Sequence, residues 1–196
     1  MHKRDLVHAR LIIKLMKDCK DLSGLSVLNF GAGHGGISNL FLALGAKVVN
    51  IEPSIPENEE KQPYNYHSVR KLADKKSKHF DLFYSSHSLE HVSSIDDALA
   101  DMKAVANQDT LYFFEVPDAS APQDGGSTGL VDIPHTYYFR KEFFLNTFSE
   151  IIMLQTLPAN YAFELEDVFI PTTISVPYST SDYGVIRCIC KGLKNS

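Results

Sequence analysis

The sequence predicts an α/β fold in which helices cover both faces of a doubly wound, mostly parallel sheet. Three observations support this prediction. An apolar run that starts at Val27 breaks into glycine at Gly31, apolar residues at helical spacing follow, and a second apolar run ends at the acidic residue Glu52. Strand, glycine turn, helix and strand in this order form a βαβ unit of about 30 residues, which is half of a doubly wound sheet.

Two helical patterns flank the first strand. Apolar residues recur at helical spacing over residues 6–19 and again over residues 37–44. The first pattern predicts a leading helix that ends before Ser23 and Gly24. The second predicts a helix that begins at the glycine loop and ends at Gly45, so its N-terminal amides would face a ligand bound at the loop.

The alternation of strands and helices continues along the rest of the chain. The pattern predicts strands at residues 64–68, 80–84, 111–116, 151–157 and 185–190, and helices at 95–105 and 139–148. Residues 71–78 are rich in lysine and are most simply a solvated helix or turn, with contact to a substrate as the alternative. The loop at 118–129 is long enough to predict a functional lid or flap.

Length and composition indicate one globular domain over residues 1–196. The chain is 44% hydrophobic and 22% charged, and its net charge of −5 argues against nucleic acid as the main partner. The three cysteines include Cys188 and Cys190, which alternate like strand residues, so we expect no disulfides and a cytoplasmic location. No apolar run approaches the roughly 20 residues that span a bilayer, so we expect neither a signal peptide nor a membrane anchor.

The glycine loop predicts a nucleotide or nucleoside site. Gly31, Gly33 and Gly36 permit backbone angles and close ligand approach that side chains would block. Glu52 lies 21 residues after Gly31, where a carboxylate can accept both ribose hydroxyls. The loop taken alone also fits an NAD-binding turn, or a tight connection with no ligand.

At five places the chain resembles the class I S-adenosylmethionine-dependent methyltransferases, particularly the small-molecule branch with a Leu-Glu-His segment after the fourth strand. Residues 27–36 are similar to the glycine-rich first motif, 48–54 to the second strand with its acid, 80–92 to the fourth-strand segment and 111–117 to the fifth strand. His135-Thr136-Tyr137-Tyr138-Phe139 stands where related proteins have a His-x-Tyr-x-Phe stretch. The resemblance covers about residues 20–157.

This resemblance implies a seven-stranded sheet with an antiparallel last strand and S-adenosylmethionine across the carboxyl ends of the first strands. It divides the domain into a leading helix (1–20), a cofactor-binding half (21–116) and a substrate-side half (117–196). Asn29 and His34 depart from the family pattern, in which an acid and a small hydroxyl residue are usual. The cofactor-binding residues that it implies are Phe30, Gly31, Ala32, Gly33, Glu52, Pro53, Ser68, Val69, Ser85 and Ser86.

Histidine suits the proton transfer that accompanies methylation of a hydroxyl. His87 and His91 follow the strand at 80–84 and His135 follows the long loop, so all three could meet at the open end of the crevice. We predict His135 and His91 as the leading base candidates and His87 as the third. The alternative is a structural role for Glu90 and His91, which would cap or bridge loops.

A metal site is a further alternative at the same place. His87 and His91 are four residues apart and could share a helical face, with Glu90, Glu115, Asp118 or His135 as further ligands. The spacing is not that of HExxH, so we predict no metal.

The sequence therefore predicts an enzyme that methylates an oxygen or nitrogen of a small molecule, with S-adenosylmethionine as cofactor. A sugar or polysaccharide precursor is the first expectation for the acceptor, by analogy with related short proteins. The alternatives are an NAD-dependent oxidoreductase, disfavoured because a separate substrate domain is absent and the Leu-Glu-His segment has no role in hydride transfer, and a non-catalytic binding module. We expect neither nucleic acid nor membrane insertion, and the sequence leaves the oligomeric state open.

Overall fold

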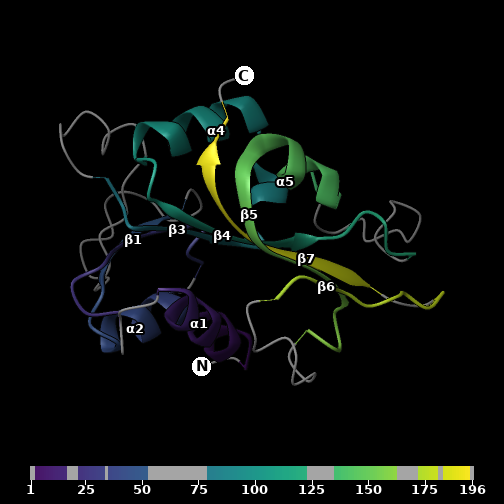
Figure 1. Cartoon of the computed structure of the whole chain (residues 1–196), viewed down its shortest axis with the longest axis horizontal. Helices are drawn as coiled ribbons and strands as arrows, with labels where there is room; N and C mark the ends of the chain where they lie inside the picture. The colour runs from purple at the N-terminus through teal and green to yellow at the C-terminus, as the bar shows by residue number, and fades with distance from the viewer. Residues whose placement is uncertain are drawn as a thin grey trace.

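A seven-stranded sheet forms the centre of the molecule (Figure 1). The computed structural model describes residues 3–16, 22–33, 35–52, 79–122, 135–162, 172–180 and 183–194. The strand order is β2-β1-β3-β4-β7-β5-β6. The strands are β1 (Ser26–Phe30), β2 (Lys47–Ile51), β3 (Leu82–Ser86), β4 (Leu111–Pro117), β5 (Phe148–Pro158), β6 (Ile174–Ser175) and β7 (Gly184–Leu193).

Among the strands that the structure describes, only β7 runs antiparallel to the others. β1 pairs in parallel with β2 and β3, and β3 pairs in parallel with β4. β7 lies antiparallel between β4 and β5, while β5 and β6 pair in parallel. The carboxyl ends of β1, β2, β3 and β4 therefore meet at one edge, where ligands of open α/β sheets bind.

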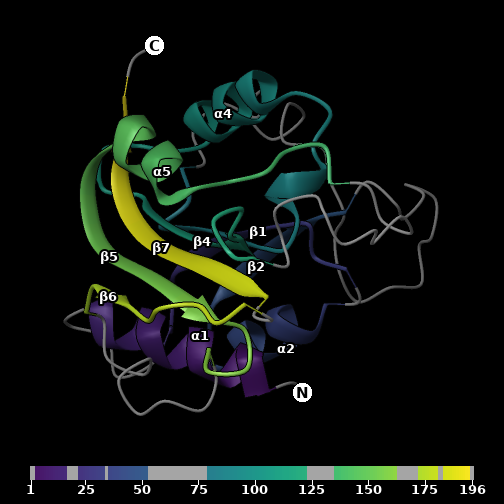
Figure 2. The ribbon, with the colours of Figure 1, turned by 90° about the vertical axis from the view of Figure 1, so that its right-hand side faces the viewer.

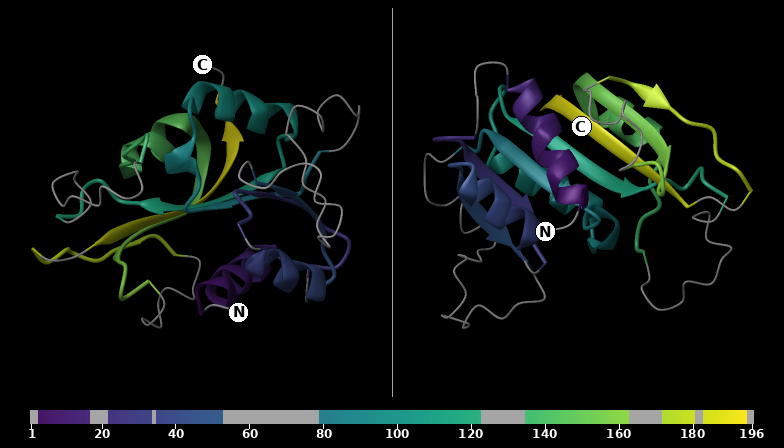
Figure 3. Two further views of the ribbon diagram at one scale, coloured as in Figure 1. Left: turned by 180° about the vertical axis from the view of Figure 1, so that it is seen from behind. Right: turned by 90° about the horizontal axis from the view of Figure 1, so that it is seen from below.

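Helices cover both faces of the sheet, as predicted. α1 (Lys3–Leu15) and α2 (Gly36–Ala43) lie side by side on one face, and α4 (Ile95–Ala104) and α5 (Lys141–Thr147) cover the other (Figures 1, 2 and 3). A short 3-10 helix, η1 (Leu89–His91), follows β3. Because side chains alternate along each strand, β4 contributes Phe113 to the core under α1 and α2 and Phe114 to the core under α4 and α5.

The predicted elements are confirmed where the structure describes them, with shifted boundaries. Phe148 was predicted as the end of a helix, but it is the first residue of β5 because its backbone pairs with Leu193 of β7. The predicted strand at 64–68 and the basic segment at 71–78 lie outside the described residues, as does most of the predicted lid at 118–129. The described residues nevertheless form seven strands, because β6 adds a short strand that the sequence pattern did not predict, at the edge of the sheet next to β5.

Within the described residues, none of the helices combines the length and apolar character needed to cross a bilayer.

Candidate functional site

The glycine loop leaves the carboxyl end of β1 in a conformation that favours glycine. Gly31 and Gly33 have positive φ angles of 75° and 52°. The amide of Gly31 donates to the carbonyl of Ile51 at 2.8 Å, and the amide of Gly33 donates to Oε2 of Glu52 at 2.8 Å. The end of β2 therefore holds the loop, and it places the Glu52 carboxylate beside the glycines.

Ser88 explains why a side chain cannot replace the hydrogen at Gly31. A Cβ built on Gly31 would lie 1.8 Å from Ser88 Oγ and 2.2 Å from Ser88 Cβ. The Ser88 hydroxyl lies 3.2 Å from the carbonyl of Gly31 and donates to it. This contact joins the glycine loop after β1 to the loop after β3, which leads directly into η1.

A buried polar cluster lies beneath the loop after β3, on the sheet face that α1 covers. Glu115 of β4 is fully buried, and its Oε2 accepts hydrogen bonds from Arg187 Nη2 at 2.7 Å and Nε at 2.9 Å. Arg187 also donates to Gln155 Oε1 at 3.1 Å and to the carbonyl of Ala162 at 3.1 Å. Burial raises the pKa of Glu115, but neighbouring His8 and Arg187 outweigh burial and hold that pKa well below its usual value.

His8 brings α1 into this cluster as a neutral imidazole. Its Nε2 lies 2.9 Å from Glu115 Oε2, and because a carboxylate only accepts, this nitrogen carries the proton. Its Nδ1 then accepts from the Tyr84 hydroxyl at 2.7 Å. Complete burial lowers the pKa of His8 to about 4, so the neutral form persists at pH 7.

His87 bridges two carboxylates. Its Nε2 lies 3.5 Å from Glu115 Oε1, and its Nδ1 lies 3.5 Å from Glu90 Oε1. Burial lowers the pKa of His87, but hydrogen bonds to Glu115 and Glu90 and their charges outweigh it and raise the pKa to about 9. At neutral pH the ring is therefore protonated and poorly suited to accept a further proton.

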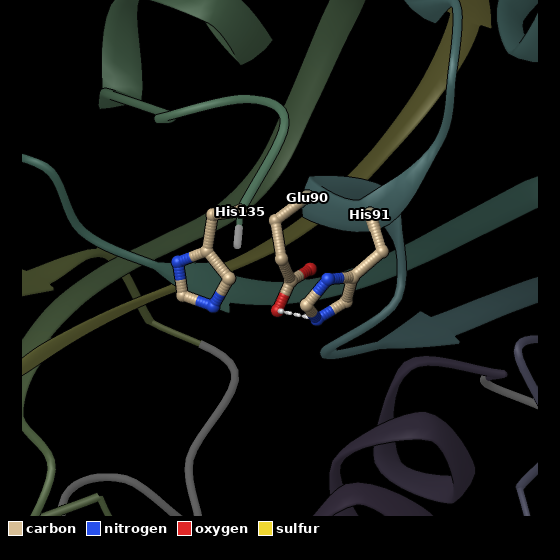
Figure 4. Close-up of side chains that lie close together, drawn as sticks. All are labelled: Glu90, His91 and His135. Atoms are coloured by element: carbon tan, nitrogen blue, oxygen red, sulfur yellow. Dashed lines mark ion pairs between the residues drawn. The ribbon is translucent and has the colours of Figure 1, made fainter. Parts of the chain in front are cut away.

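The second cluster joins Glu90, His91 and His135, and we refer to it as the Glu-His-His cluster. One donor atom from each of the three residues can be chosen so that all lie within 4.8 Å of one another. The two imidazole rings meet edge to face with centroids 5.0 Å apart, and His91 Nε2 lies 3.9 Å from Glu90 Oε1. Figure 4 shows the Glu90 carboxylate between the two imidazoles, with the three side chains pointing the same way.

Main-chain hydrogen bonds hold the two segments of this cluster together. The amides of Thr136 and Tyr137 donate to the carbonyl of Glu90 at 2.8 Å and 3.1 Å. Partial burial lowers the pKa of His135, against the attraction of Glu90, and so favours the neutral ring that a base requires. The structure thus brings together the two leading base candidates, His91 and His135, and places His87 between Glu90 and Glu115.

The predicted helical face for a metal does not exist. His87 has a positive φ of 50° and precedes η1, so the chain turns between it and His91. The alternative in which these two side chains share a helical face is therefore wrong. The i, i+4 spacing implies a common face only if all the intervening residues are helical.

The predicted cofactor residues fall into three groups. Glu52 and the three loop residues Gly31, Ala32 and Gly33 lie together at the carboxyl edge, next to Phe30 at the end of β1. At the end of β3, Ser86 is partly exposed whereas Ser85 is fully buried, and the Ser85 hydroxyl has no hydrogen-bond partner among the described residues. Pro53, Ser68 and Val69, with His34, lie outside the described residues.

Sequence reasoning did not identify His8, Ser88 or Arg187. A signal for His8 was present, because it precedes Leu11 and Ile12 by three and four residues and therefore lies on the apolar face of the leading helix. Arg187 likewise stands among alternating buried residues of the last strand. A polar side chain on a buried face requires a partner, and the sequence does not say which.

Comparisons with known proteins identify the family and the fold. A family model described as a methyltransferase domain matches residues 2–150. The plantazolicin methyltransferase BpumL, crystallised with a desmethyl plantazolicin analogue and SAH, has a TM-score of 0.61 at 12% identity, with 97% of this chain and 85% of that chain covered.

Two further crystal structures share the fold. The YcgJ protein from Bacillus subtilis has a TM-score of 0.56 at 12% identity, with coverage of 96% of this chain and 99% of that chain. Coclaurine N-methyltransferase bound to N-methylheliamine and SAH has a TM-score of 0.57 at 15% identity, with coverage of 79% and 51% respectively. No curated protein sequence matches this chain.

Proposed function

Since this chain belongs to the methyltransferase domain family and is an S-adenosylmethionine-dependent methyltransferase, we propose that it methylates an oxygen or nitrogen of a small molecule at the Glu-His-His cluster. The cofactor supplies an electrophilic methyl carbon bonded to a sulfonium. The protein must align a nucleophile with that carbon, exclude water and remove a proton.

The glycine loop and Glu52 fit the adenosyl part of the cofactor. Gly33 is exposed, and a Cβ built on it would meet nothing within 4 Å, so a ligand can lie directly against this backbone. Glu52 would accept hydrogen bonds from the ribose hydroxyls, and its bond to the Gly33 amide fixes the carboxylate beside the loop. SAH, the product of S-adenosylmethionine, is bound in the plantazolicin and coclaurine methyltransferase structures, which agrees with this role.

His135 is the proposed general base. An acceptor hydroxyl or amine would lose its proton to a ring nitrogen of His135 as its oxygen or nitrogen bonds to the methyl carbon, while the carbon–sulfur bond breaks and its electron pair stays on sulfur. The observation that carries this proposal is the position of His135. The amide of Thr136, the residue after His135, donates to the carbonyl of Glu90. Glu90 in turn lies two residues after Ser88, whose hydroxyl donates to the carbonyl of Gly31 in the glycine loop.

A sugar or polysaccharide precursor is the acceptor class that we propose first, in a cytoplasmic setting without nucleic-acid partners. Such acceptors present neutral hydroxyls, which need a base before they attack. The partly exposed His135 and the exposed His91, with Glu90 between them, offer acceptors and donors for several hydroxyls.

Transfer of radiolabelled methyl groups from S-adenosylmethionine to a panel of sugars, sugar nucleotides, phenols and amines tests this proposal. His135→Ala should lower turnover by about 10²–10⁴-fold and leave cofactor affinity within about twofold. His79→Ala is the matched control, because His79 is exposed and lies before β3. Equal turnover in the two variants would contradict the role of His135, and thermal stabilisation by NAD but not by S-adenosylmethionine would contradict the proposed function.

A further inference from the structure

We propose that Glu90, His91 and His135 bind one divalent first-row transition-metal ion, and that this ion holds the acceptor through two adjacent oxygens. The inference rests on the proposed function for the role of the ion, but not for its binding. Two imidazoles and one carboxylate form a donor set that such ions bind in proteins, and three protein ligands leave coordination positions open to a substrate.

The distances suit an ion after a small adjustment. Ligand atoms roughly 2.0–2.2 Å from a metal lie roughly 3.0–3.5 Å from one another. One donor atom from each of Glu90, His91 and His135 already lies within 4.8 Å of the others, so the cluster must contract by on the order of an ångström. His91 is exposed and His135 is partly exposed, so both rings can make this movement by side-chain rotation.

Glu90 supplies an independent observation. Its side chain is 1% exposed, and its Oε2 is buried without a hydrogen-bond partner among the described residues. A buried carboxylate oxygen without a partner is unfavourable, and such atoms in folded proteins usually have one. The other oxygen of the carboxylate, Oε1, lies 3.9 Å from His91 Nε2, so a cation bound there would compensate the burial of the carboxylate as a whole. Figure 4 shows the carboxylate between the two imidazoles that would complete the ligand set.

The surroundings hold the carboxylate ready for this role. His87 Nδ1 lies 3.5 Å from Oε1 of Glu90, and the Glu90 carbonyl accepts the amides of Thr136 and Tyr137. Hydrogen bonds of this kind orient metal ligands and tune their affinity. The backbone bonds also fix the separation between the segment that carries His91 and the segment that carries His135.

A bound ion would change how the acceptor loses its proton. A hydroxyl bound to the ion has a lower pKa and releases its proton to bulk water, so the alkoxide oxygen attacks the methyl carbon and the carbon–sulfur bond breaks as before. With the ion bound, His135 would be a ligand through one ring nitrogen in place of the general-base role proposed above, and solvent would take the proton. An acceptor with two adjacent oxygens, such as a vicinal diol or a catechol, would occupy two open positions of the ion.

Metal binding by the tag-free, chelator-treated chain tests the inference without reference to activity. Titration with Co²⁺, followed by its visible absorption and by calorimetry, should show one ion per chain. Affinity should fall by at least about 10-fold in Glu90→Gln, His91→Ala and His135→Ala. It should stay unchanged in His79→Ala, with circular dichroism showing that each variant is folded.

Unchanged affinity in folded Glu90→Gln and His135→Ala variants would overturn the metal site. Methyl transfer then separates this proposal from the proposed function. Activity that is lost on chelation and restored by Co²⁺, Mn²⁺ or Zn²⁺ supports the ion, and preference for vicinal diols or catechols over isolated hydroxyls supports the acceptor class. Methyl transfer that persists after chelation but is lost in His135→Ala would refute the metal site and support His135 as the general base. Metal binding by a chain that does not bind S-adenosylmethionine would refute the proposed function alone.

Discussion

Replacing Gly31 with alanine should destabilise the protein by about 2–5 kcal/mol. The left-handed φ of 75° costs an alanine about 1–2 kcal/mol. The new methyl group would also lie 1.8 Å from Ser88 Oγ and 2.2 Å from Ser88 Cβ, and relieving such overlap in a packed site costs typically about 1–3 kcal/mol more. Urea unfolding, monitored by circular dichroism, measures the total loss of stability as a lower midpoint urea concentration with an unchanged dependence of the unfolding free energy on urea.

Gly24→Ala separates the two contributions. Gly24 has a φ of 84°, and a Cβ there would meet nothing within 4 Å, so this variant should lose only about 1–2 kcal/mol. Ser88→Gly should rescue Gly31→Ala, because the nearest remaining Ser88 atom, its Cα, lies 3.6 Å from the new Cβ. The double-mutant cycle should give a favourable coupling of about 1–3 kcal/mol. Equal losses in Gly31→Ala and Gly24→Ala, with no coupling, would refute the contact between the two loops.

Two further predictions concern the cofactor and pH. Glu52→Ala should weaken binding of S-adenosylmethionine by about 1–3 kcal/mol in calorimetry, because a hydrogen bond to the ribose is lost, and unchanged affinity would remove Glu52 from the site. The stability of the protein should fall by about 3 kcal/mol between pH 6.5 and pH 4, because His8 in the unfolded chain gains its proton below pH 6.5, whereas the folded pKa is about 4. Above pH 6.5 His8 is neutral in both the folded and the unfolded chain, so its titration no longer lowers the stability. If the His8→Gln variant lost the same free energy of unfolding between pH 6.5 and pH 4, another group would be responsible.

Local patterns predicted most of the scaffold. The apolar run before Gly31 and the helical spacing after it specify β1 and α2, because each element must bury one face or stripe against the sheet. They also predicted that Glu52 would lie beside the glycine loop, since parallel strands joined by a helix end at the same edge of a sheet.

The sequence predicted which histidines lie at the candidate site, but not which side chains each of them contacts. His91 and His135 were predicted to converge, and the structure shows them in contact. The alternative of a shared helical face for His87 and His91 was wrong, because His87 has a positive φ and its ring lies between Glu115 and Glu90. Side-chain direction at a turn depends on a single backbone angle, and residue spacing does not encode that angle.

The sequence by itself determined the order of the predicted strands and helices, the glycine loop, the acid beside it and the family. These features depend on local periodicity and on glycines, whose positive φ angles few other residues adopt. Only the tertiary structure decided which charges meet. His8 and Glu115 are 107 residues apart in the chain, yet they share a hydrogen bond under α1. Burial and charge pairing act through space, so the protonation of His8, Glu115 and His87 follows from packing that no single segment specifies.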